Sequence, residues 1–273
     1  MQIKQDRKYP IVLAIAGSEP LGSAGVQADI KSISACGGYA AGALTCIVNE
    51  NTTEVKDIFS LPVDLVTGQV ESFLGDLDAS AIKMGMLYSA ELIEKLSVVL
   101  KKYSHIPLIV DPVMVASGGE QLIENSAVEA YKKYLFPLAT IITPNRREAE
   151  LLLGKKVTID SAEKDATALC QWGNSVIIKS IIAGDDKLED AFCDVEDGTT
   201  SLIMKEYVET RNINGTGCTF SSSIATFLAR GFNLKEAISR AEEYINGAIV
   251  SGARYEFGKG IGPVDHFYKF NAH

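Results

Sequence analysis

Long apolar runs, metal-binding patterns and basic clusters are all missing from this 273-residue chain. No run of 18 apolar residues occurs, and the charged segment 1–8 has no signal-peptide core, so we expect neither a membrane span nor a leader. The chain has no Cys-x-x-Cys pair and only three histidines, which makes a zinc site unlikely on sequence grounds. Five scattered cysteines argue against a disulfide framework and favour a reducing compartment, so we expect a cytoplasmic protein.

Positive charge is also scarce. The net charge is −9 and no Lys/Arg cluster stands out, which argues against nucleic acid or an anionic membrane as a partner. A small anionic substrate remains compatible if backbone N–H groups, one or two lysines and Mg²⁺ supply a local positive field. With 47% apolar residues, no linker and no repeat, the chain is expected to form a single domain over residues 1–273.

Short apolar runs alternate with helical patterns along most of the chain. The runs predict strands at 11–16, 43–48, 81–84, 108–110, 140–142 and 176–178. The helices are expected near 26–36, 63–74, 90–102, 126–135 and 161–172, with a later one opening near 215 and a last one capped by Asn233 and Glu236. This alternation predicts an α/β fold with a mostly parallel sheet covered on both faces. Past Lys179 the pattern becomes a hairpin with an Asp197-Gly198 turn.

The segment from Asn212 to Thr219 reads Asn-Ile-Asn-Gly-Thr-Gly-Cys-Thr and opens a helix. Its glycines permit a backbone that a Cβ would crowd, and the N–H groups at a helix start favour a phosphate or a developing oxyanion. Cys218 sits at the same end, where helix N–H groups can lower a thiol pKa. The segment therefore favours phosphoryl or acyl transfer, with a glycine-rich helix start and a buried cysteine as the alternative.

Several segments match, in order, the hydroxymethylpyrimidine/phosphomethylpyrimidine kinases of thiamine biosynthesis. They are 17–31, 51–53, 83–87, 111–115, 143–148, 215–219 and 258–264. Over residues 10–268 the chain is thus similar to that family. The resemblance implies a ribokinase-like three-layer fold, ATP with Mg²⁺ as cofactors, and a homodimer that binds a small pyrimidine.

The resemblance also implies roles for individual residues. The substrate would be bound by Asp29, Glu50, Asn51, Met86 and Val113. The nucleotide would be bound by Lys179, Asn145, Asn214 and Thr216. Oxygen ligands suit Mg²⁺, which would be held by Asp111, Asn145 and Glu148. Bland alternatives are a surface position for Asp29 and Lys179, core packing for Met86 and Val113, and helix capping for Glu148.

Transfer itself is assigned to the loop residues Gly215, Thr216, Gly217 and Cys218. Many ribokinase-like kinases place an Asp base where this chain has Cys218. A thiol pKa lowered at the helix start would give a usable thiolate near pH 7. A second phosphorylation would need no base, because the acceptor phosphate is already anionic. No His–Asp pair is placed to serve a nucleophile, so acyl transfer drops out.

Some positions depart from the family pattern around the expected pocket, namely Glu19, Glu50, Asn214 and Ser180-Ile181-Ile182. They leave a pyridoxal/pyridoxine kinase open, as well as a catalytically weak ligand-binding paralogue. Glu50 favours the pyrimidine, because a carboxylate accepts from an exocyclic amine and repels an ionised phenolic oxygen.

Overall fold

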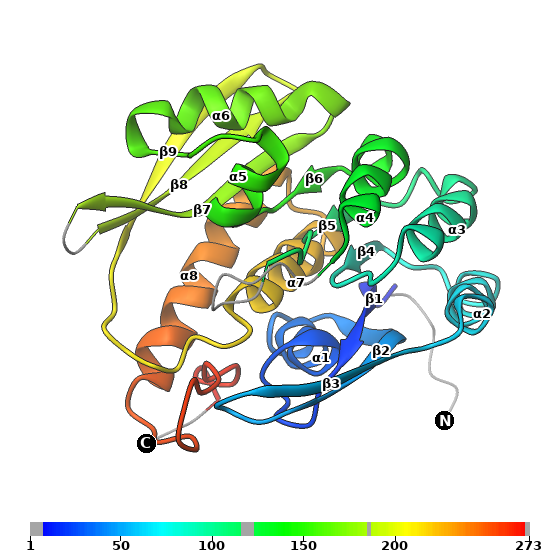
Figure 1. The fold of residues 1–273 in the computed structure, drawn as a ribbon, viewed down its shortest axis with the longest axis horizontal. Coiled ribbons are helices and arrows are strands. Elements are labelled where there is room, and N and C mark those ends of the chain that lie inside the picture. Colours follow the sequence, from blue (N-terminus) through cyan, green and yellow to red (C-terminus); the bar gives the residue numbers. More distant parts are fainter. Residues whose placement is uncertain (1–7, 116–122, 185–186, 271–273) are drawn as a thin grey trace, which may run out of the picture.

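The computed structural model describes residues 8–115, 123–184 and 187–270. A nine-stranded sheet runs through it in the order β3-β2-β1-β4-β5-β6-β7-β8-β9 (Figure 1). The strands are β1 (Ile11–Ser18), β2 (Tyr39–Glu50), β3 (Val55–Ser60), β4 (Ala81–Met84), β5 (Leu108–Val110), β6 (Ile141–Ile142), β7 (Ser175–Gly184), β8 (Lys187–Asp194) and β9 (Thr199–Glu206). Pairing is parallel from β2 to β7, whereas β3, β8 and β9 join antiparallel. The predicted α/β fold is confirmed.

Helices cover both faces of the sheet (Figure 1). One layer holds α1 (Gly25–Ala35), α7 (Thr216–Ala229) and α8 (Leu234–Gly252), and the other holds α2 (Val63–Leu74), α3 (Ala90–Lys101), α4 (Asn125–Ala130), α5 (Arg146–Leu153) and α6 (Ala162–Leu169). In β1, Val12 and Ala14 join the core under the first layer, while Leu13 and Ile15 join the core under the second. This period of two fits a strand buried on both faces. None of the described helices is long and apolar enough to cross a membrane.

Most of the predicted elements are confirmed, including the capping box of Asn233 and Glu236 and the β8–β9 hairpin around Asp197-Gly198. The helix expected at 126–135 is α4 followed by a π-helical segment, Tyr131–Leu135. Strand β3 was not predicted. Most of its residues are exposed at the edge of the sheet, so it has no buried face to produce an apolar alternation.

The functional residues gather at the carboxyl ends of the parallel strands. Loops leave β1, β4, β5 and β6 at this edge, and the start of α7 approaches them there (Figure 1). Parallel strands place all their carboxyl ends on one edge, and open α/β sheets bind ligands at that edge. The chain thereby brings segments from residue 17 to residue 218 into one region.

Candidate active site

The loop that opens α7 has a backbone that requires glycine. Gly215 is the N-cap of α7 with φ +77°, and a Cβ there would lie 1.7 Å from the Ser23 carbonyl oxygen. Asn214 Nδ2 donates to Ser23 Oγ at 2.9 Å, which joins this loop to the loop after β1. No side chain caps α7, and the Thr216 N–H donates to the Ile213 carbonyl at 3.3 Å. Binding of an anion by the N–H groups of this helix start stays a prediction.

The loop after β1 is folded around the carboxylate of Glu19. This nearly buried group accepts hydrogen bonds from the N–H groups of Gly22 (3.1 Å) and Ala24 (2.7 Å), from both N–H and hydroxyl of Ser23, and from the Leu21 N–H. The acid at this position thus shapes the wall against which Gly215 packs.

Lys179 and Asp111 form a buried ion pair beside the glycine loop. Lys179 Nζ donates to Asp111 Oδ1 at 2.8 Å, and the second carboxylate oxygen accepts from Ser221 Oγ at 3.2 Å. A Cβ on Gly217 would lie 3.3 Å from Lys179 Nζ and 3.4 Å from Asp111 Oδ2. Burial opposes the charge of Asp111, but the ammonium groups of Lys179 and Lys83 outweigh burial and hold its pKa below the ordinary value. A solvated surface position for Lys179 is therefore excluded.

Asn145 and Glu148 form a capping box at the start of α5. Asn145 Oδ1 accepts from the Glu148 N–H at 3.0 Å, and Glu148 Oε2 accepts from the Asn145 N–H at 2.8 Å. The capping alternative for Glu148 is thus real. Burial, followed by the negative charge of Asp111, raises the pKa of Glu148 to about 8. A cation between these two carboxylates would relieve that cost, so their chemistry fits Mg²⁺.

No cluster of three or more His, Cys, Asp or Glu residues in the described part of the chain could hold a metal ion on its own. Mg²⁺ commonly keeps several waters and uses only one or two carboxylates together with substrate phosphates. The pair Asp111 and Glu148, with Asn145 beside them, suits that mode. Their role as magnesium ligands stays a prediction.

Cys218 corrects the expectation of a low thiol pKa. Burial raises the pKa of Cys218 to about 11, and the carboxylates of Asp29 and Asp111 add to the rise. The Lys83 ammonium and a hydrogen bond from the Gly25 N–H favour the thiolate, but they do not outweigh burial. The helix start was therefore not sufficient evidence for an ionised thiol at neutral pH.

A second buried ion pair lies on the Cys218 side of the site. Asp29 is fully buried and accepts from Lys83 Nζ at 2.7 Å and from Ser222 Oγ at 2.6 Å, so the surface alternative for Asp29 is wrong. Its Oδ2 has no hydrogen-bond partner among the described residues. Burial raises the pKa of Asp29, although Lys83 counteracts the rise. Contact of Asp29 with a substrate stays a prediction.

The residues expected to bind the ring lie at the ends of β2, β4 and β5. Glu50 is the last residue of β2, and its burial, followed by the nearby charge of Glu19, raises its pKa to about 6. Met86 and Val113 are both half-buried, so part of each residue stays accessible and core packing does not bury it completely. The Met86 methyl group would lie 3.5 Å from a Cβ on Gly17.

Asn51 has a clear local function in the turn between β2 and β3. Its exposed side-chain oxygen accepts from the Thr53 N–H at 2.8 Å, from the Thr53 hydroxyl at 2.6 Å and from the Glu54 N–H at 3.1 Å. The neighbouring Thr52 carbonyl accepts from the Ile261 N–H at 2.8 Å. Asn51 therefore fixes the shape of the turn whose Thr52 contacts the segment around Ile261, and direct contact of Asn51 with substrate stays a prediction.

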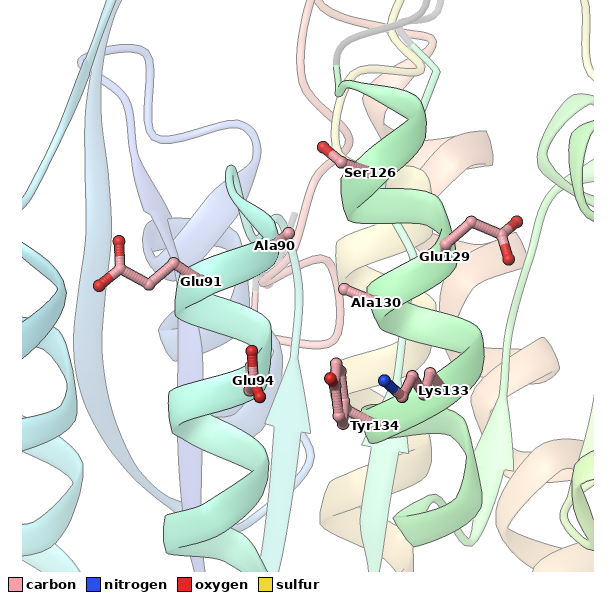
Figure 2. A pocket seen from close by; sticks show the side chains of 8 residues that line it. All are labelled: Ala90, Glu91, Glu94, Ser126, Glu129, Ala130, Lys133 and Tyr134. Carbon is pink, nitrogen blue, oxygen red and sulfur yellow. The ribbon is translucent and has the colours of Figure 1, made fainter.

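A surface cavity of about 390 Å³ lies elsewhere, between α3 and the α4 region (Figure 2). In Figure 2, Glu94 of α3 lies across from Tyr134 and Lys133, while Glu91 and Glu129 extend away from the gap. This cavity contains neither of the two ion pairs and no residue of the glycine loop. The candidate active site at the strand ends is therefore distinct from this cavity.

Comparison with known proteins decides the family. The phosphomethylpyrimidine kinase family matches residues 19–265. The protein belongs to the phosphomethylpyrimidine kinase family. The hydroxymethylpyrimidine/phosphomethylpyrimidine kinase of Rhizobium meliloti is 39% identical over 95% of this chain and 98% of its own length. A thiamine biosynthesis bifunctional protein of Geobacter sulfurreducens is 39% identical over 93% of this chain, which spans 52% of that longer protein.

A solved structure supports the same fold. The ADP complex of Bacillus subtilis pyridoxal kinase superposes with a TM-score of 0.88 at 30% identity, covering 97% of this chain and 100% of that one. The resemblance to the phosphomethylpyrimidine kinase family and the predicted fold class are thereby confirmed.

Some important residues of this kinase were not singled out from the sequence. Lys83 lies within the family-like segment 83–87 but has no role predicted for it, and its partner Asp29 is 54 residues away in the chain. Asp190 of β8 and Lys205 of β9 form a further buried ion pair, with 2.5 Å between Nζ and Oδ2, next to strand β7, which carries Lys179. Periodicity predicts strands and helices at or next to these residues, but it carries no signal for long-range charge pairing.

Proposed function

We propose that the protein is an ATP-dependent kinase of thiamine biosynthesis. It phosphorylates the hydroxymethyl group of 4-amino-5-hydroxymethyl-2-methylpyrimidine and then the resulting monophosphate. One observation carries the proposal: Lys179 Nζ and Asp111 Oδ2 would lie 3.3 and 3.4 Å from a Cβ on Gly217, in the loop that opens α7. A cation, an acid and a helix N-terminus thus converge, within a chain that belongs to this kinase family.

The transfer is an in-line displacement that depends on positioning and charge. Phosphoryl-transfer transition states are loose, so fixed donors around the equatorial oxygens stabilise them most. The N–H groups from Gly215 to Cys218 bind the transferring group, and Lys179 meets the ATP phosphates as a point charge. Asn145, Asn214 and Thr216 line the nucleotide side. Asp111, Glu148 and Asn145 would hold Mg²⁺, which would supply positive charge to neutralise the phosphate oxygens.

Cys218 contacts the acceptor hydroxyl and takes its proton in the first phosphorylation. With a pKa of about 11, the thiolate fraction of Cys218 is on the order of one in ten thousand at pH 7. The first step should therefore accelerate as the pH rises. In the second step the acceptor is a phosphate oxygen that is already ionised, so the same loop works without a base.

The ring is bound at the ends of β2, β4 and β5. Glu50 accepts a hydrogen bond from the exocyclic amine, and Met86 and Val113 pack against the two faces of the heteroaromatic ring. Asp29 and Asn51 complete the substrate side. Since the pKa of Glu50 is about 6, its carboxylate is mostly ionised at pH 7 and attracts an amine donor.

A pyridoxal kinase on the same scaffold is the second candidate. It is favoured by the similarity to Bacillus subtilis pyridoxal kinase at a TM-score of 0.88. Glu50 argues against it, because an ionised phenolic oxygen next to this carboxylate would be repelled. A catalytically weak ligand-binding protein is a third candidate, and the complete set of loop, Lys179 and acidic residues argues against it.

The test is ADP release by the Mg²⁺-saturated protein with hydroxymethylpyrimidine, its monophosphate or pyridoxal as acceptor. We expect turnover of both pyrimidines and a lower kcat/KM for pyridoxal. Preferred turnover of pyridoxal would replace the first candidate by the second, and no turnover by a folded protein would leave only the ligand-binding protein.

The proposal extends to a cytoplasmic homodimer. The edge strand β3 carries exposed apolar side chains at Val55 and Phe59, which a second copy could cover. Sedimentation equilibrium gives the mass directly, and a monomer at micromolar concentration would refute the dimer.

A further inference from the structure

Lys179 stands in a β-bulge between β7 and β8. The register of this pair shifts between Ile178 and Ile181, so Lys179 and Ser180 together face the single residue Asp190 on β8. Ile178 and Ile181 consequently point into the same hydrophobic core, although they are three residues apart. Bulges re-aim side chains next to active sites, and this one determines where the side chain of Lys179 points.

The second residue of the bulge adopts a backbone conformation that needs support. Ser180 has φ +61°, and no other non-glycine residue of the described chain has a positive φ. A residue with a Cβ reaches the left-handed region only at a steric cost. The N–H of Ser180 donates to Asp190 Oδ1 at 2.8 Å, and this hydrogen bond stabilises the left-handed conformation. Asp190 is fully buried, so the hydrogen bond is shielded from competing water.

The other oxygen of Asp190 is fixed by a buried network. Lys205 Nζ contacts Asp190 Oδ2 at 2.5 Å and Glu242 Oε2 at 2.8 Å. The same ammonium group lies 5.2 Å from the ring centroid of Phe220, on the helix that starts at the glycine loop. The carboxylate of Asp190 is thereby held by β9, α7 and α8 rather than by its own strand alone.

On the other side of Ser180, the chain continues directly into the proposed nucleotide site. The Lys179 N–H donates to the Pro144 carbonyl at 2.9 Å, and its ammonium group contacts Asp111. A change of φ at Ser180 would rotate the peptide that joins it to Lys179. The geometry at Ser180 and the aim of Lys179 are therefore linked through one peptide bond.

We propose that Asp190 is a positioning residue for nucleotide binding: by accepting the Ser180 N–H, it locks the bulge that aims Lys179 at the ATP phosphates. The inference rests on the proposed function, because Lys179 is assigned to the phosphates there. Asp190 itself touches neither nucleotide nor acceptor in this account. Asp190 therefore affects nucleotide binding only, and it does so through the backbone conformation of Ser180.

A glycine at position 180 provides the decisive test. Glycine adopts a positive φ without the steric cost, so it makes the support from Asp190 partly dispensable. The full-length variants to compare are Asp190→Ala, Ser180→Gly and the double variant. Asp194→Ala is the matched control, because it removes another nearly buried carboxylate of β8, one that contacts Ser175 and the Glu196 N–H and is remote from Ser180.

The readouts are KM for ATP, KM for hydroxymethylpyrimidine and the Kd of Mg·ADP by calorimetry. Asp190→Ala is expected to raise KM for ATP and the Kd of Mg·ADP about tenfold, as for a lost hydrogen bond to a charged group, while KM for the pyrimidine stays within about twofold. Ser180→Gly in the same background should recover most of the loss. Asp194→Ala should match the wild type in nucleotide affinity.

A merely structural role for Asp190 gives a different result. If the double variant binds Mg·ADP as weakly as Asp190→Ala, or if both KM values rise equally, the positioning role is wrong. Should Asp190→Ala fail to fold, Asp190→Asn serves instead, because its Oδ1 can still accept the Ser180 N–H. Near-normal ADP affinity in Asp190→Asn supports the role of the hydrogen bond to Ser180. A tenfold loss of ADP affinity in this variant assigns the effect to the ion pair with Lys205 and overturns the positioning role. The ADP measurement holds even if the protein phosphorylates neither pyrimidine, so failure of the proposed function is seen separately in the turnover assay.

Discussion

Two lysine–aspartate pairs lie within this one site, and they differ in their surroundings. The Lys83–Asp29 pair has both side chains at 0% exposure, whereas the Lys179–Asp111 pair has exposures of 9% and 3%. Their Nζ–Oδ1 distances are nearly equal, 2.7 and 2.8 Å. The closed pair is on the Cys218 side, and the open pair borders the Gly217 backbone.

The difference indicates a division of labour. Asp111 accepts from Thr143 and Ser221 in addition to Lys179, so it stays satisfied when the lysine turns to a phosphate. Asp29 has a smaller reserve, because Ser222 is its one hydroxyl donor besides Lys83 and its Oδ2 has no partner in the described chain. A buried pair with few alternatives maintains structure and local potential, while a pair with more alternatives can exchange partners during catalysis.

Removing the cation of the closed pair should have the largest effect on folding. Lys83→Met leaves the Asp29 carboxylate buried without its cation, and breaking such a pair costs about 3–5 kcal/mol in the free energy of unfolding. Urea denaturation at pH 7 measures this cost. The double variant Lys83→Met/Asp29→Asn, which removes both charges, should recover much of it. A loss below about 1 kcal/mol for Lys83→Met would show that the closed pair is not structural.

Removing the cation of the open pair should affect catalysis more than folding. Lys179→Met is expected to lower kcat/KM for ATP about a hundredfold, as for other charge-stabilising groups in phosphoryl and acyl transfer. Its unfolding free energy should fall less than that of Lys83→Met, because Asp111 retains two hydroxyl donors. Initial rates at varied ATP and urea titration give both numbers. Lys187→Met, at an exposed position on β8, controls for the loss of charge. Equal destabilisation by both active-site substitutions would erase the distinction between the pairs.

How far the sequence predicted this site depends on the range of each interaction. Strand–loop–helix units, the glycine loop and the Asn233–Glu236 capping box are local, so residue spacing predicts them. Asp29 was assigned to the flank of a helix with a surface position as the alternative, because nothing in its neighbourhood reveals Lys83. The partly buried Cys218 is also surrounded by groups that are distant in the sequence, such as Asp29 and Asp111, and a local argument from the helix start therefore predicted the wrong direction of its pKa.

The Ser180 bulge was equally invisible in the sequence. A glycine there would have signalled a positive φ, but a serine carries no such signal. Ser180 is among the positions that depart from the family pattern, and in this structure its positive φ is supported by the hydrogen bond to Asp190. Edge strand β3 was not predicted for a different reason: it has no buried face, so its sequence shows no apolar alternation.

The substrate end provides a prediction of intermediate size. Protonation of Glu50 removes its acceptor charge, so kcat/KM for hydroxymethylpyrimidine should fall as the pH drops below about 6, the pKa of Glu50. Glu50→Gln should lower kcat/KM at pH 8 about tenfold and remove this acid limb. Because Glu50 belongs to neither lysine pair, KM for ATP should stay unchanged. An acid limb that persists in the variant would assign it to another group.

Ser180→Gly should have the smallest effect and should sharpen the description of the open pair. Relief of the left-handed conformation is offset by the greater freedom of glycine in the unfolded chain, so the net stabilisation is about 0.5 kcal/mol. The urea midpoint measures it. A destabilisation above about 1 kcal/mol would mean that the serine is not strained at this position.

The central claim is that one loop performs two phosphorylations and needs Cys218 as a base only for the first. The most direct test compares wild type and Cys218→Ala with each pyrimidine between pH 7 and 9. For hydroxymethylpyrimidine, the wild-type kcat should rise with pH because the pKa of Cys218 is about 11, and the variant should lose about a hundredfold together with that slope. For the monophosphate, the two proteins should differ by less than about fivefold, because a phosphate acceptor needs no base. Equal losses in the two steps would contradict the claim.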